Sequence, residues 1–201
     1  NAIPRTAEVV LTIPADNPED LKDLVAYCKT TFEAEYRGVE DTITLTVEPC
    51  ELPAGIVPQE IQDNLVNAIT ACHDGVLRYI PSIPSVVETS SNLGIITIGE
   101  GKADVLILAR SSNETMMEYI QEMQEACFSM AGMKVEYGGQ YGAWQPNFDS
   151  PITATMVKVH KALFNEDAKV QVCHAGLECS IIGGIYTHMD LVSFGPTLRS
   201  P

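Results

Sequence analysis

Hydrophobic residues alternate with polar ones in some stretches of the chain and recur every three or four residues in others. The alternation predicts half-buried strands, and the longer spacing predicts helices that bury one face. Residues 75–84 contain Pro81 and Pro84 and are expected to be irregular. We expect strands at residues 6–13, 42–47, 85–98, 103–109 and 134–137, and helices at residues 16–36, 59–73, 112–130 and 151–164.

The order of these elements indicates a repeated module. Residues 6–47 give strand, helix, strand, and residues 59–137 give helix, strand, strand, helix, strand. The second set is most of a βαββαβ unit, and the first set matches the back half of another. The sequence therefore predicts an α+β fold: a doubled, ferredoxin-like domain over residues 1–142, with half-repeats near 1–50 and 51–142, whose first copy is incomplete.

Residues 143–201 are expected to form a separate piece. The segment AWQPNFDS at 143–150 has the composition of a boundary, and a helix should start at Pro151. A strand, a glycine-containing helix and a second strand are expected after it, because short apolar runs bounded by Gly and Pro are typical of buried strands. About sixty residues are too few for an independent core, so we expect one edge of a larger α/β sheet.

The helix expected after Gly176 has two interpretations. The N–H groups of Gly176, Leu177 and Glu178 would open the helix, and a helix N-terminus can hold an anion such as a peptide carboxylate. Alternatively, Gly176 only permits a tight turn and Glu178 only occupies a first helical turn, where acidic residues are favoured without any ligand. The residues alone leave both interpretations open.

Charge and cysteine pattern narrow the functional classes. The formal net charge of −15 argues against nucleic acid and anionic membranes as partners, since both need basic surfaces. No apolar run approaches the roughly 20 residues that span a bilayer, and no secretory segment opens the chain. The six cysteines contain no CxxC pair and mostly fall in apolar patterns, which predicts buried, reduced thiols and a cytoplasmic protein.

The chain has no self-contained catalytic pattern. A hydrolytic metal site needs about three converging ligands, and the four histidines show none of the spacings HxH, HExxH or HxxxH. There is also no GxSxG, no phosphate-binding loop and no dinucleotide fingerprint. We therefore expect neither catalytic residues nor metal ligands within these 201 residues. The four histidines are His73, His160, His174 and His188.

Several motifs resemble one enzyme family. HAGLE at 174–178, IIGGIY at 181–186 and SFGPTLRSP at 193–201 are similar to the closing part of the cytosolic aminoacyl-histidine dipeptidases, which belong to the M20 metallopeptidases, and NAIPR at 1–5 and VVETSSNLG at 86–94 also match. The resemblance implies that residues 1–142 are most of a lid and residues 143–201 a returning part of the catalytic domain. It places the two zinc ions of the longer protein on ligands before Asn1 and just after Pro201.

The same resemblance implies residues that hold substrate. Arg110 corresponds to a lid arginine that binds the dipeptide carboxylate, and a planar guanidinium suits a carboxylate well. Asn1 and Asn92 correspond to lid asparagines near the scissile bond. The lid histidine that stabilises the tetrahedral intermediate in relatives has no counterpart near residues 53–58, which leaves the oxyanion partner undefined. The implied substrate-binding residues are Asn1, Asn92, Arg110, Ala175, Gly176 and Leu177.

Three functional hypotheses follow. The first is that the chain is part of a zinc-dependent dipeptidase hydrolysing Xaa-His or other unblocked dipeptides by metal-activated water, and is inactive alone. The second is a non-catalytic dimerisation or binding module, because ferredoxin-like units pair readily into homodimers. The third, based on the residues alone, is a small-molecule-binding α+β domain without enzymatic activity.

Overall fold

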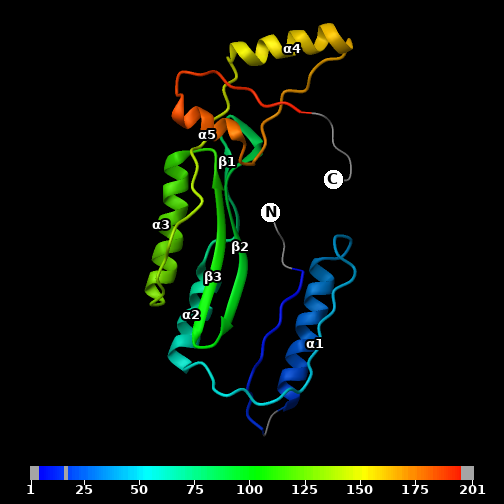
Figure 1. Ribbon diagram of the computed structural model, residues 1–201. Helices are drawn as coiled ribbons and strands as arrows, with labels where there is room; N and C mark the ends of the chain where they lie inside the picture. The colour runs from blue at the N-terminus through cyan, green and yellow to red at the C-terminus, as the bar shows by residue number, and fades with distance from the viewer. Residues whose placement is uncertain (1–4, 16–17, 196–201) are drawn as a thin grey trace. The chain divides into compact units, whose positions relative to one another are not determined.

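The computed structural model describes residues 5–15 and 18–195, and within them it contains five helices and one three-stranded sheet. These residues divide into two compact units, Arg5–Pro58 and a unit that begins at Gln59. Figure 1 shows the elements in chain order. The fold is α+β, as the sequence predicts, whereas the doubled ferredoxin-like arrangement stays a prediction.

The unit Arg5–Pro58 is built on helix α1 (Pro18–Glu35). Proline in the first turn together with Glu19 and Asp20 gives the expected start, because proline needs no N–H there and acidic groups face the positive end of the helix dipole. None of the helix residues is buried. The remaining described residues of this unit are turns and extended chain without assigned strands.

The second unit contains an antiparallel sheet of β1 (Gly75–Ile80), β2 (Ile83–Gly99) and β3 (Lys102–Ser111), in that order. Helix α2 (Gln59–Ala71) precedes the sheet, and α3 (Glu114–Met130) follows it and packs along β3 and β2 (Figure 1). The β2–β3 turn places Glu100 and Gly101 at φ of 50° and 75°, as a tight hairpin requires.

The core lies between α2, α3 and the inner face of the sheet. Ala68, Cys72 and Phe128 are buried there and pack against Leu93 and Val105 of the two long strands. The Cys127 thiol of α3 also donates a hydrogen bond to the Ala68 carbonyl of α2 at 3.1 Å. The two helices are thus fixed to each other as well as to the sheet.

Helix α3 begins as expected, but its buried face differs from the expected one. The spacing predicts an apolar stripe of Met117, Ile120, Met123, Cys127 and Met130. Of these only Ile120 is buried, and the other buried positions are Gln124 and Phe128. Gln124 is accommodated because its side-chain amide donates to Ser91 Oγ of β2 at 2.7 Å. Met130 is 82% exposed.

Other expectations were wrong. Residues 75–80 form a strand, because Pro81 lies in the β1–β2 turn and Pro84 lies outside the paired positions, so neither removes a ladder hydrogen bond. Residues 6–13, 42–47, 134–137 and 170–172, and the second strand expected before Pro196, have no strand assignment. Alternation predicts an extended chain, but a strand also needs a hydrogen-bonded neighbour, which the pattern does not specify.

The cysteines are free, as expected, but they are not uniformly buried. Only Cys72 is buried, whereas Cys50 and Cys173 are exposed and the other three lie between these extremes. Cys50 and Cys173 are in extended chain outside the regular elements, where an apolar sequence neighbourhood does not guarantee packing.

The last part of the chain contains α4 (Pro151–Phe164) and α5 (Glu178–Ile185). The start of α4 is capped by Ser150, whose Oγ accepts from Thr153 N at 3.1 Å. Asp190 reinforces this cap, because its Oδ2 accepts from both Ser150 Oγ and Ile152 N at 2.9 Å. The segment after α5 is therefore tied to the beginning of α4.

Candidate functional site

The paired strands β2 and β3 place Arg110 opposite Ser90, near the end of β3. Asn92 follows two positions along β2, opposite Leu108. Side chains two residues apart on a strand point to the same face, so Ser90 and Asn92 share a face of the sheet. The Arg110 Nε is buried and has no hydrogen-bond partner among the described residues.

His174, from the last part of the chain, contacts Ser90 and lies near Arg110; we refer to these three residues and Asn92 as the Arg110 cluster. The His174 Nε2 lies 2.6 Å from the Ser90 hydroxyl, although 84 positions separate the two residues in the sequence. Burial lowers the pKa of His174, and the nearby Arg110 charge lowers it further, while a hydrogen bond with the Val87 backbone acts in the opposite direction. Burial and the Arg110 charge therefore favour the neutral imidazole over the imidazolium.

The chain that follows His174 forms a close contact with Tyr141. A Cβ at position 176 would lie 2.1 Å from the Tyr141 hydroxyl oxygen and 2.6 Å from its Cζ, so a larger residue there would require the Tyr141 side chain to move. Tyr141, Gly176 and Leu177 line a pocket of about 210 Å³ together with Glu178 and Ile181. The tight-turn interpretation of Gly176 is thus too narrow, because the glycine also permits this approach of a side chain.

Helix α5 starts at Glu178, one residue later than expected, with Leu177 as its N-cap. The Leu177 side chain makes no capping hydrogen bond, and its backbone oxygen accepts from Ser180 N at 2.9 Å and Ser180 Oγ at 2.6 Å. Backbone N–H groups at such a start favour negative charge.

The expected site residues have different outcomes. The structure brings Arg110 of β3 and the segment that begins at His174 to one region, and Asn92 lies on the neighbouring strand β2. Asn1 lies outside the described residues. Sequence reasoning missed Ser90 and His174 as members of the cluster. The signal available was that His174 opens HAGLE and Ser90 lies inside VVETSSNLG, the two motifs that carry much of the resemblance.

A zinc ion does not fit the described residues. They contain no group of three or more His, Cys, Asp or Glu side chains arranged to hold a metal ion. His174, whose pKa is lowered by the nearby Arg110 charge, has its Nε2 2.6 Å from the Ser90 hydroxyl rather than beside an acidic group.

Comparison with known proteins finds similarity to dipeptidases. No protein-family model matches the chain. All 201 residues align at 31% identity with the cytosol non-specific dipeptidase of Escherichia coli (strain K12), covering 41% of that protein. The crystal structure of aminoacylhistidine dipeptidase from Vibrio alginolyticus superimposes with a TM-score of 0.85 at 33% identity over 94% of this chain and 39% of that one. The chain is homologous to a segment of these dipeptidases.

This homology confirms the resemblance drawn from the sequence motifs. The segment spans about two fifths of the length of each dipeptidase relative.

No helix in the described part of the chain combines the length and apolar character needed to cross a membrane.

Proposed function

We propose that this chain belongs to a zinc-dependent dipeptidase, in which it supplies most of the lid, residues 1–142, and a returning part of the catalytic domain, residues 143–201. The longer protein would hydrolyse Xaa-His or other unblocked dipeptides in the cytoplasm, with two zinc ions on ligands outside this chain. The homology to two dipeptidases supports the reaction class. The cluster around Arg110 supports the role of this part.

The role we assign to this cluster is binding of the dipeptide carboxylate. The guanidinium of Arg110 provides a fixed positive charge with several donors, and a carboxylate accepts two of them in parallel. Its buried Nε has no partner among the described residues, so the group is not already neutralised by an ion pair there. The N–H groups of Ala175, Gly176 and Leu177 would add donors from the segment just before α5, and Asn1 and Asn92 would contact the substrate nearer the scissile bond.

The neutral state of His174 is consistent with this role. A second permanent cation beside Arg110 would repel it, and the burial of His174 avoids this cost by holding the imidazole in its uncharged form. The Ser90 hydroxyl then fixes the orientation of the ring. The single observation that carries the proposal is this convergence of Arg110, on β3, with the segment that opens α5.

Replacement of Arg110 by alanine in the full-length enzyme tests the proposal. Loss of a charged hydrogen bond to the substrate should lower kcat/KM by an amount equivalent to roughly 1.5–3 kcal/mol. Arg37→Ala is the matched control, because Arg37 is exposed in a turn of the other unit. Zinc dependence is tested separately, by dialysis against a chelator followed by addition of Zn²⁺. An unchanged kcat/KM in Arg110→Ala would remove Arg110 from the substrate site.

A non-catalytic module is the alternative. In that case the full-length protein would associate in a concentration-dependent manner and would bind no dipeptide, with or without Arg110. Analytical ultracentrifugation and a dipeptide titration separate the two functions. Dipeptide binding that depends on Arg110 favours the dipeptidase.

A further inference from the structure

Glu88 on β2 is a buried carboxylate that is only half satisfied. The residue is 3% exposed, and its Oε2 is paired with Arg78 Nε of β1 at 3.1 Å. Its Oε1 is also buried and has no hydrogen-bond partner among the described residues. A buried carboxylate oxygen without a donor is costly, and native proteins rarely retain one without a reason.

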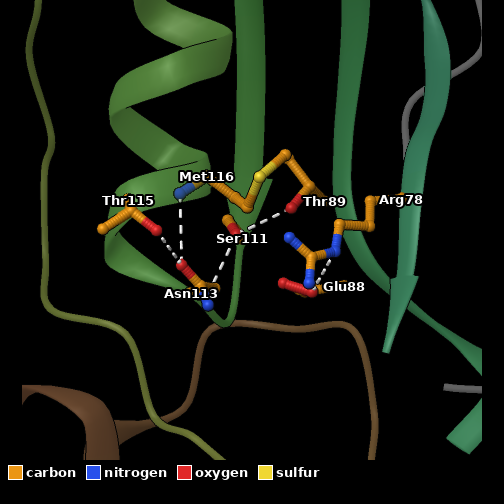
Figure 2. A network of polar contacts seen from close by, with 7 residues as sticks. All are labelled: Arg78, Glu88, Thr89, Ser111, Asn113, Thr115 and Met116. Atoms are coloured by element: carbon orange, nitrogen blue, oxygen red, sulfur yellow. Dashed lines mark hydrogen bonds and ion pairs between the residues drawn. The ribbon is translucent and has the colours of Figure 1, made fainter. Parts of the chain in front are cut away.

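Hydrogen bonds fix the backbone and the neighbouring residues around Glu88. The Glu88 backbone oxygen accepts from Ser112 N at 3.1 Å, and the neighbouring Thr89 hydroxyl lies 2.9 Å from Ser111 Oγ. Asn113 is fixed as the cap of α3, since its Oδ1 accepts from Met116 N at 3.2 Å. Figure 2 shows the Glu88 carboxylate beneath the Arg78 guanidinium, pointing toward the start of α3.

Glu88 and Arg78 both line a pocket of about 180 Å³. Arg78 is 42% exposed at its side chain, and a guanidinium has five N–H donors, of which the ion pair occupies only part. The lining includes polar residues, among them Ser112 and Asn113, and apolar residues, among them Pro146 and Phe148, but neither Arg110 nor His174.

The charges in this pocket restrict the ligand. A simple amine would satisfy Glu88 Oε1 but would bring a second cation next to Arg78. A simple carboxylate would satisfy the free donors of Arg78 but would bring a second anion next to Glu88. A zwitterion avoids both repulsions, because its ammonium group donates to Glu88 and its carboxylate accepts from Arg78. The apolar lining residues then suit a small aliphatic side chain, and the pocket volume suits a single amino acid.

We propose that the pocket between β1, β2 and the start of α3 binds a free aliphatic α-amino acid. Glu88 binds its ammonium group, Arg78 binds its carboxylate, and Phe148 with Pro146 contacts its side chain. Free amino acids are also the products of dipeptide hydrolysis, but this binding proposal does not depend on the proposed function. Its test measures binding alone.

The test is a calorimetric titration of the full-length protein with L-leucine. Two half-ligands are titrated in parallel: isoamylamine, which lacks the carboxylate, and 4-methylpentanoate, which lacks the ammonium group. L-leucine should bind at least about tenfold more tightly than either, since each half-ligand loses a charged hydrogen bond and retains one repulsion. Equal binding of leucine and a half-ligand would overturn the proposal, as would no binding of leucine at millimolar concentration.

Variants place the ligand in the pocket. Glu88→Gln and Arg78→Met should each raise the leucine Kd at least about tenfold. Glu136→Gln and Lys134→Met are the matched controls, because these residues form an exposed ion pair on the same unit. If Glu88→Gln does not fold, Arg78→Met and the exposed Phe148→Ala carry the test. Leucine binding that persists in these variants but disappears in Arg110→Ala would assign the ligand to the other cluster and contradict the proposal.

Discussion

The Ser90 hydroxyl and the His174 imidazole, 2.6 Å apart, connect the middle of β2 to the segment that opens α5. The contact brings HAGLE to the part of the sheet that carries Arg110. Burial and the Arg110 charge both disfavour the imidazolium, so protonation of His174 should weaken this part of the fold.

Stability should fall as the solution becomes mildly acidic. The pKa of His174 is below its ordinary value of 6.5 in the folded protein, so between pH 6.5 and that lower value the unfolded chain binds a proton that the folded chain does not. The contribution is fully present above pH 6.5 and is lost as pH falls through the folded pKa. Denaturant unfolding at a series of pH values measures it. His174→Gln should flatten the dependence between pH 7.5 and 5 relative to the wild type, whereas the exposed His188→Gln should not; identical curves for all three would contradict the assignment.

Gly176→Ala should disrupt the site. The new Cβ would lie 2.1 Å from the Tyr141 hydroxyl, so the Tyr141 side chain must leave its position beside residue 176, at a cost of at most about 1 kcal/mol because this side chain is 51% exposed. The midpoint temperature of thermal unfolding and the affinity for a dipeptide should both fall. Tyr141→Ala in the same chain should relieve the clash, and Gly184→Ala is the control because its Cβ would meet nothing within 4 Å. A Gly176→Ala protein as stable as Gly184→Ala would show that the contact is not required.

Asp190→Ala should loosen the beginning of α4. The variant loses the acceptor of Ser150 Oγ and Ile152 N, and removal of a helix cap costs about 0.5–2 kcal/mol. Asp190→Asn retains one acceptor oxygen and should lose less. Chemical denaturation measures both, and Asp167→Ala provides the comparison, since Asp167 forms only an exposed ion pair with Lys161. Equal losses in the Asp190 and Asp167 variants would argue against the cap.

The thiols should react in order of their exposure. Burial raises the pKa of Cys72 to about 11, with smaller contributions from Cys127 and Asp74, and the thiolate is the reactive form. Iodoacetamide at pH 8 should therefore modify the exposed Cys50 and Cys173 well before Cys72. Peptide mass spectrometry over time gives the order. Early modification of Cys72 would mean that α2 and α3 separate readily.

The sequence predicted the elements that local chemistry specifies. Pro151 at the start of α4 and Asn113 at the start of α3 are capping signals that operate within a few residues, and both helices begin where they indicate. It was less successful where the outcome depends on a distant partner. Gln124 is buried only because Ser91 accepts its hydrogen bond, and no helical spacing indicates that.

The candidate site also combines a residue that the sequence indicates with contacts that depend on distant partners. Arg110 was predicted from the family resemblance, but the pairing of Ser90 with His174 links residues 84 positions apart and depends on how the last part of the chain returns to the sheet. The half-satisfied Glu88 was likewise invisible in the sequence, since an acidic residue inside an alternating strand is ordinarily expected to face solvent.

The central claim is that Arg110 holds the carboxylate of a dipeptide, and its most direct test compares a dipeptide with its C-terminal amide. The measurement is the ratio of kcat/KM for the free acid to kcat/KM for the amide, in the full-length wild type and in Arg110→Ala. The wild type should prefer the free acid, and Arg110→Ala should reduce that preference by about tenfold or more, because only the free acid offers a charge to the guanidinium. If the ratio in Arg110→Ala equals that of the wild type and of the control Arg37→Ala, the account is contradicted.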